Sequence, residues 1–169
     1  MAQPRKAEAP PQDVPWLDDE EQVAWRAVAK MMTKLRWALE CQLERDAGLS
    51  FIEYHALARL SEEPEHTLRM SQLAAVTNAS LSRLSHLVKR LESWGLVRRE
   101  PDPTDGRFTN AILTEAGYSR LVASAPAHVT AVRRLVIDEF RPTELSRLRD
   151  ASERIVARTE ASDWKQTLT

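Results

Sequence analysis

The chain has 169 residues, which is enough for one hydrophobic core and short for two independent domains. Its formal net charge of −1 argues against a protein that coats nucleic acid through overall positive charge. No segment approaches the ~20 apolar residues of a membrane span, and the first residues lack the apolar core of a secretory signal, so we expect a cytoplasmic protein with no membrane partner. The single cysteine, Cys41, excludes an intrachain disulfide and a multi-cysteine zinc site.

The first two segments differ sharply in composition. Residues 1–16 contain several prolines among small and charged residues and are predicted to be a disordered arm. Residues 17–47 are predicted to form a long helix, which Gly48 ends. Its apolar residues are spaced three and four apart, as in helices that pack on one another, at Trp25, Val28, Met32, Leu35 and Leu39. Trp37 lies off this stripe, about 120° round the helix.

Residues 48–114 are predicted to form a winged helix-turn-helix domain. Its first helix begins at Ser50 and closes before Pro64. Buried positions are expected at Ile52, Ala56, Leu57 and Leu60. A shorter helix, which Ser71 begins, is expected to bury Leu73, Ala74 and Val76. A turn over residues 77–79 then leads to a longer helix, and two helices joined so closely cross steeply enough for the second to enter a DNA major groove.

The longer helix has two contrasting faces between its N-cap, Ser80, and its stop, Gly95. One face is apolar and is expected to pack on the core through Leu81, Leu84, Leu87, Val88, Leu91 and Trp94. The other face has only hydrogen-bond donors and no acid, with Ser82, Arg83, His86, Lys89, Arg90 and Ser93. A merely solvated helix face usually mixes both signs of charge, so this face favours a polyanionic partner.

After this helix, residues 96–100 and 107–113 are predicted to be two strands of a β-wing. The connection between them is rich in proline, aspartate and glycine, and Arg107 is expected at the tip. Thr114 is predicted to cap a further helix, which Pro126 should kink, and Pro142 marks the break before a last helix over residues 144–160.

Several segments of this region resemble the MarR family of bacterial winged helix-turn-helix transcription regulators. They are Met70–Ala74, Ser82–Glu92, Gly95–Arg99, Asp102–Arg107 and Leu113–Gly117. The resemblance covers residues 17 to about 160 and implies a mainly α fold with a small β-wing. Gly106 departs from the family pattern, because it stands where a second basic residue is common.

Helices at both ends of the chain have more apolar surface than one winged domain can cover, so residues 17–47 and 115–165 are predicted to form a helical dimerisation region. A two-fold dimer would present two recognition helices to half-sites about 34 Å apart. The expected partners are therefore double-stranded DNA, in the form of a pseudopalindromic operator, and a second copy of the chain.

The predicted DNA-binding residues divide by role. Ser71 and Ser80 would present helix N-termini to phosphate, and Ser82 and His86 lie where base edges would pass. Arg83, Lys89 and Arg90 would contact phosphate or guanine. The family resemblance implies that Arg107 enters the minor groove and that Asp105 shapes the tip of the wing.

Relatives resembling this family commonly bind small aromatic acids or phenols, which would make such a compound the effector of a repressor. Trp37, Phe51 and His55 are the candidate ligand-binding residues. No cofactor is expected, and the four histidines have no spacing that suggests a metal site.

Other functions compete with a ligand-released repressor. The protein could bind DNA constitutively, act as a thiol-based redox sensor through Cys41, or use its winged helix for protein contact only. An inert thiol is favoured over the sensor because no basic partner for Cys41 is evident. No catalytic motif supports an enzyme.

Overall fold

A computed structural model describes residues 14–161, so most of the predicted N-terminal arm and residues 162–165 of the predicted dimerisation region lie outside it. The chain divides into two compact units, residues 1–36 and residues 37–169. The boundary falls within the first helix, α1 (Asp19–Ala47), rather than at its end.

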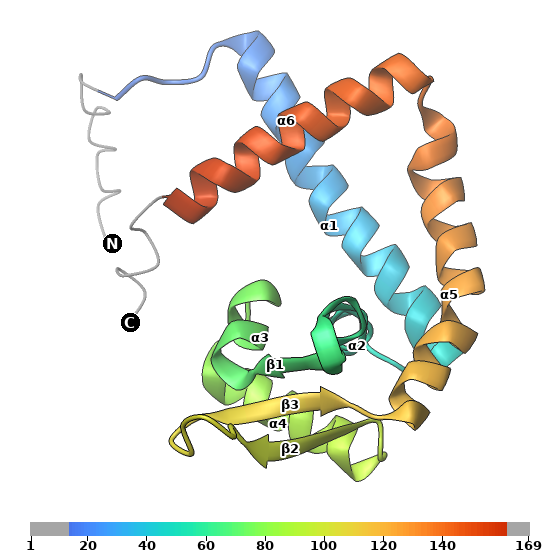
Figure 1. Cartoon of the computed structure of the whole chain (residues 1–169). Coiled ribbons are helices and arrows are strands. Elements are labelled where there is room, and N and C mark those ends of the chain that lie inside the picture. The colour runs from blue at the N-terminus through green and yellow to red at the C-terminus, as the bar shows by residue number, and fades with distance from the viewer. Residues whose placement is uncertain (1–13, 162–169) are drawn as a thin grey trace, which may run out of the picture. The chain divides into compact units, whose positions relative to one another are not determined.

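The second unit contains the small sheet and the helices around it (Figure 1). In the described residues, the helices after α1 are α2 (Phe51–Glu62), α3 (Met70–Val76), α4 (Leu81–Ser93), α5 (Glu115–Leu135) and α6 (Pro142–Ala161). The strands are β1 (Thr67–Arg69), β2 (Val97–Pro101) and β3 (Thr109–Leu113), with single 3₁₀ turns at Pro64–His66 and Ile137–Glu139. The sheet is antiparallel in the order β1-β3-β2. This is the mainly α fold with a β-wing that the sequence predicts.

The predicted caps at Ser80 and Thr114 are confirmed, and Ser50, predicted as the start of a helix, is also a cap. The Ser50 hydroxyl accepts the backbone N–H of Glu53, and the Glu53 carboxylate accepts the backbone N–H of Ser50 in return. Ser80 caps α4, and Thr114 caps α5. Because each cap satisfies a backbone donor that the first turn leaves unpaired, it fixes where its helix begins. Gly95, with φ of +71°, ends α4 in the left-handed conformation that glycine adopts most readily.

The apolar face of α4 forms much of the core. Leu84, Leu87, Val88 and Leu91 are buried with residues of α2, α3 and the sheet. The prediction was wrong at both ends of this face, because Leu81 is 57% exposed and Trp94 is 47% exposed. Leu81 lines a surface cavity at the start of the helix, and Trp94 is the C-cap, beyond the last turn that packs on the core.

The start of α3 also differs from the prediction. Ser71 does not cap this helix, because Arg69 is the N-cap and its backbone N–H donates to the Gln72 side chain at 3.1 Å. Residues 67–69 pair with β3 as strand β1 and run directly into α3, so the helix begins earlier than expected. A strand of three residues is too short to show a periodic pattern. Val76, predicted to be buried, is 48% exposed.

The helices after the wing leave many apolar side chains exposed. α5 continues through Pro126, and Val122 and Val129 are both 53% exposed. α6 begins at Pro142, two residues before the predicted start, since the fixed φ of proline suits the first position of a helix. None of its residues is buried. Among the helices of residues 14–161, none has both the length and the apolar character needed to span a membrane.

Candidate nucleic-acid interface

The first three turns of α4 present an exposed basic face. Ser82, Arg83, His86 and Lys89 are all exposed, as predicted for a helix that contacts DNA. Neither Arg83 nor Lys89 forms an ion pair with any residue in the range 14–161. At the start of the helix, the Ser80 hydroxyl accepts the Arg83 backbone N–H at 3.3 Å. The Arg83 and Lys89 side chains are thus available to a partner.

Arg90, the next residue, is already engaged. Its Nε donates to Oε1 of Glu53 at 2.5 Å, and its guanidinium lies 5.4 Å from the centre of the Trp94 ring. Glu53 is only 1% exposed, and its Oε2 also accepts the backbone N–H and the hydroxyl of Ser50, each at 2.8 Å. Arg90 therefore joins α4 to the start of α2. Its predicted DNA contact remains a prediction, and this structural role was not foreseen.

Other basic residues near α4 are paired as well. Arg99 on β2 binds Oε2 of Glu92 through both Nε and Nη2, at 3.1 and 2.7 Å. This contact holds the pKa of Glu92 below its usual range. Arg98 pairs with Glu100 on the same strand. Of the five basic residues between 81 and 99, three are thus bound to acids in the protein itself.

At the tip of the wing, Asp105 and Arg107 form a local ion pair, with 2.6 Å between Oδ2 and Nη2. Asp105 also accepts the backbone N–H of Arg107 at 3.1 Å. The pair lowers the pKa of the Asp105 carboxyl and raises the pKa of the Arg107 guanidinium. The Arg107 side chain is 85% exposed, so an incoming anion can reach it without any rearrangement of the core.

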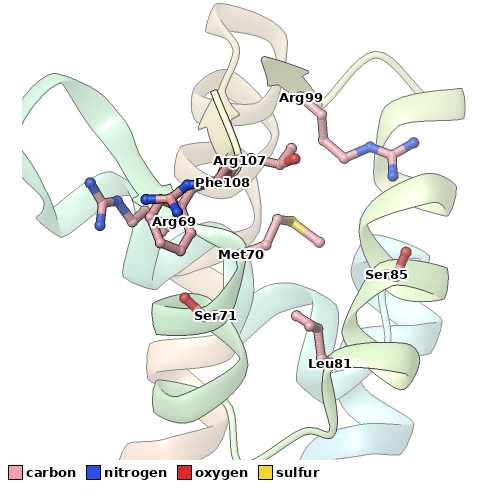
Figure 2. Close-up of a pocket in the computed structure, with 9 residues that line it drawn as sticks. Arg69, Met70, Ser71, Leu81, Ser85, Arg99, Arg107 and Phe108 are labelled. Atoms are coloured by element: carbon pink, nitrogen blue, oxygen red, sulfur yellow. The ribbon is translucent and has the colours of Figure 1, made fainter. Parts of the chain in front are cut away.

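A cavity of about 270 Å³ lies between α3, α4 and the wing (Figure 2). It is lined by Arg69, Met70, Ser71, Leu81, Ser85, Arg99, Arg107, Phe108 and Thr109. The structure thus brings the predicted residues Ser71 and Arg107 to one hollow. Arg69 and Phe108 were not foreseen, and the Arg69 guanidinium lies 4.6 Å from the centre of the Phe108 ring.

Asp102 organises the loop of the wing from a site that is only 8% exposed. Its Oδ1 accepts the hydroxyl and the backbone N–H of Thr104, at 2.6 and 2.9 Å, and the backbone N–H of Asp105 at 3.2 Å. Its Oδ2 accepts Nε of Arg69 at 2.8 Å. The hydrogen bonds from Thr104, together with the contact to Arg69, hold the pKa of this carboxyl far below its usual range.

Solved structures of other proteins are similar to this chain in fold and sequence over most of its length. The chain is 44% identical to Sco3205, a MarR family transcriptional regulator from Streptomyces coelicolor solved in complex with DNA, with a TM-score of 0.82 over 88% of this chain and 96% of that one. It is 40% identical to AbsC, another MarR family regulator from Streptomyces coelicolor, over 88% of this chain and all of that one, with a TM-score of 0.83. The chain belongs to the MarR family of transcriptional regulators. The family's own sequence pattern matches residues 47–107.

A more distant MarR family relative has a ligand. CouR from Rhodococcus jostii, solved with p-coumaroyl-CoA, is 25% identical over 82% of this chain and 92% of that one, with a TM-score of 0.66. No curated protein sequence matches the chain significantly.

The candidate ligand residues of this MarR family protein are only partly brought together. The rings of Phe51 and His55 stack tilted, with 4.2 Å between their centres, whereas Trp37 is 65% exposed. A cavity of about 470 Å³ opens elsewhere, between the end of α1 and the second half of α5. It is lined by Ala38, Gln42, Arg45, Asp46, Pro126, Ala127, Thr130, Ala131, Arg134 and Leu135.

Neither Cys41 nor His128 lines one of these two cavities. Cys41 is half-buried with its thiol free. His128 is buried, and its Nδ1 lies 2.9 Å from Oε1 of Gln42. Burial lowers the pKa of His128. Within residues 14–161, no three histidine, cysteine or acidic side chains gather as a metal site would require.

Proposed function

We propose that this MarR family regulator is a homodimeric repressor that binds a pseudopalindromic DNA operator and is released from it by a small aromatic or phenolic ligand. The exposed, acid-free face of α4 is the observation that supports DNA binding most directly. Arg83 and Lys89 on this face form no ion pair with an acid among the described residues, and Arg107 of the wing lines the same cavity as Leu81 at the start of α4. Sco3205, a DNA-bound protein of similar fold, supports the same conclusion.

The proposed dimer rests on apolar side chains that the described chain leaves uncovered. In α1, Trp25 is 55% exposed and Met32 is 51% exposed. In α6, Ile155 is 60% exposed and Val156 is 51% exposed. Exposed apolar residues in such numbers are typical of surfaces that a protein partner covers. A second copy would also supply the second recognition helix that a pseudopalindromic site needs.

The proposed effector rests on the likeness to CouR and on the space available in this chain. An aromatic acid is small enough for the cavity between α1 and α5, where Arg134 offers a positive charge and several alanines offer apolar contact. Such a ligand acts only if it binds the DNA-competent and the DNA-incompetent states of the dimer with different affinity. A coupling free energy of ~1 to 3 kcal/mol would weaken DNA binding ~5- to 150-fold.

The DNA-binding proposal is tested by selecting duplexes from genomic fragments with the full chain and measuring their affinity by mobility shift at fixed salt. Arg83→Ala should weaken DNA binding, because Arg83 lies on the exposed basic face of α4. Arg59→Ala is the matched control, since Arg59 is an exposed arginine on α2 that pairs with Glu62. Equal affinity of both variants and the wild type would point to a winged helix that serves protein contact instead.

The effector and the dimer need separate measurements. Sedimentation of the full chain should give twice the monomer mass at micromolar concentration, and a monomer would contradict the proposal. A panel of benzoic, cinnamic and salicylic acids should include a compound that releases the selected duplex. If none does so while binding remains specific, the protein binds DNA constitutively. Release by peroxide that Cys41→Ser abolishes would indicate the redox alternative.

A further inference from the structure

We propose that Arg69 is a positioning residue for DNA binding: through Asp102 it holds the wing in place and so sets where Arg107 meets the duplex. This inference rests on the proposed function, which assigns Arg69 no role. In this inference, the ion pair between Arg69 and Asp102 joins the helix-turn-helix to the wing.

Arg69 lies at the point where the two parts of the domain meet. Its backbone closes strand β1 opposite Asn110 of β3 and then caps α3. Its side chain crosses to the wing, where Nε binds Oδ2 of Asp102 at 2.8 Å and the guanidinium lies over the ring of Phe108. Figure 2 shows Arg69 and Phe108 together at the wing side of the cavity, across from Ser85 and Leu81 of α4.

Asp102 extends the same connection to the tip. One of its oxygens holds the backbone N–H groups of Thr104 and Asp105, while the other holds Arg69. Asp105 in turn binds both the backbone and the guanidinium of Arg107. A continuous series of hydrogen bonds therefore leads from the start of α3 to the exposed arginine that would enter DNA.

These hydrogen bonds hold the tip of the wing in one position, and this affects the affinity for DNA. A wing whose tip is held in one position loses less conformational entropy on binding than a wing that must be ordered by the DNA. The Asp102 carboxylate is only 8% exposed and accepts hydrogen bonds on both oxygens, so an amide in its place, with a single acceptor oxygen, cannot hold both Arg69 and the loop. The tip would then sample other positions, and the contact of Arg107 would weaken.

The decisive variant is Asp102→Asn, because positioning and simple electrostatics predict opposite signs. Removal of a negative charge near DNA should tighten binding if charge alone matters. We expect instead that Asp102→Asn weakens binding ~10-fold, close to the loss from Arg107→Ala, which removes the contact itself. The probe is the duplex that the wild-type chain selects, measured by mobility shift.

Three further measurements separate positioning from a direct phosphate contact and from a folding defect. Arg69→Lys keeps the positive charge but loses the Nε geometry and the planar stacking on Phe108, and should bind as weakly as Asp102→Asn. The slope of log affinity against log salt should fall by ~0.9 in Asp102→Asn, although no cation has been removed. In a double variant, adding Arg107→Ala to Asp102→Asn should weaken DNA binding by less than a further ~2-fold, because the contact of Arg107 with DNA is already lost.

Each outcome decides the inference. Asp102→Asn that binds as tightly as the wild type, or an Arg69→Lys variant with wild-type affinity, would overturn it. Thermal unfolding of every variant shows which proteins are folded at the assay temperature. If Asp102→Asn is unfolded at that temperature, the affinity of Arg69→Lys decides the inference. A wild-type chain that selects no duplex contradicts the proposed function instead, and wild-type binding that is sensitive only to Arg83→Ala contradicts this inference alone.

Discussion

Lys89 and Arg90 are neighbours on the polar side of α4, yet they belong to two groups of residues that behave differently. In the first group, Arg83 and Lys89 are exposed and form no ion pair within residues 14–161. In the second group, Arg90 binds the buried carboxylate of Glu53, and Glu92 binds Arg99 of β2. The first group is available to DNA, whereas the second joins α4 to α2 and to the sheet.

This difference shows that the basic residues in the sequence of a helix are not all available to bind a partner. Within α4 the polar face has no acid, but the fold brings Glu53 to it from 37 residues away. A buried carboxylate needs a partner, because burial without one costs several kcal/mol. We therefore expect substitutions on the two groups to separate DNA affinity from stability.

Arg83→Ala should give the largest change and should act on DNA affinity alone. A lost contact to a base or to a phosphate costs about 1 to 3 kcal/mol of binding free energy, whereas an exposed substitution changes stability by less than ~0.5 kcal/mol. Mobility shift and urea unfolding of the same preparation measure both quantities. A loss of stability in Arg83→Ala would remove the distinction between the two groups.

Arg90→Ala should show the opposite pattern. It leaves Glu53 buried without its arginine, and we expect the free energy of unfolding to fall by about 2 kcal/mol, less than for a fully buried pair because the Arg90 side chain is 54% exposed. Urea unfolding measures the loss, with Arg59→Ala as the control from an exposed ion pair. If Arg90→Ala is fully stable but binds DNA as weakly as Arg83→Ala, Arg90 is a DNA contact after all.

Lys89→Ala should have a smaller effect, because a phosphate contact holds DNA without reading its sequence. We expect specific and nonspecific duplexes to be weakened alike, and the slope of log affinity against log salt to fall by ~0.9. Affinities measured at several salt concentrations check this. A loss confined to one base position would show that Lys89 reads sequence.

The smallest effect is expected on the pH dependence of stability, through His128, which is buried against the neutral side chain of Gln42. Burial lowers the pKa of His128 in the folded state, so the unfolded state takes up a proton first as the pH falls below the ordinary value of 6.5. The stability that His128 contributes is thus complete above pH 6.5 and declines as the pH falls toward the lower pKa of the folded state. His128→Gln should flatten the stability profile below pH 6.5. An unchanged profile would show that His128 ionises as readily in the folded protein as in the unfolded chain.

Much of the winged domain could be predicted because its signals are local. Ser50, Ser80 and Thr114 cap their helices with donors and acceptors only three residues away. The apolar face of α4 follows the period of the helix, and the aspartates, prolines and glycine of the wing favour a turn whatever surrounds them. Errors fell at the ends of elements, as at Leu81 and Ser71, where the neighbouring element decides which residue is covered.

The sequence by itself determined the helix-turn-helix, its wing and the basic residues of α4, since these follow from caps, periodicity and turn residues close together in the chain. Only the tertiary structure decided which charges remain available. It paired Arg90 with Glu53, and Arg69 with Asp102 from 33 residues away. It also explains Gly117, where a Cβ would lie 2.1 Å from the backbone oxygen of Leu96. Such contacts depend on how distant segments pack, and a single contact between two distant residues has no periodic pattern in the sequence.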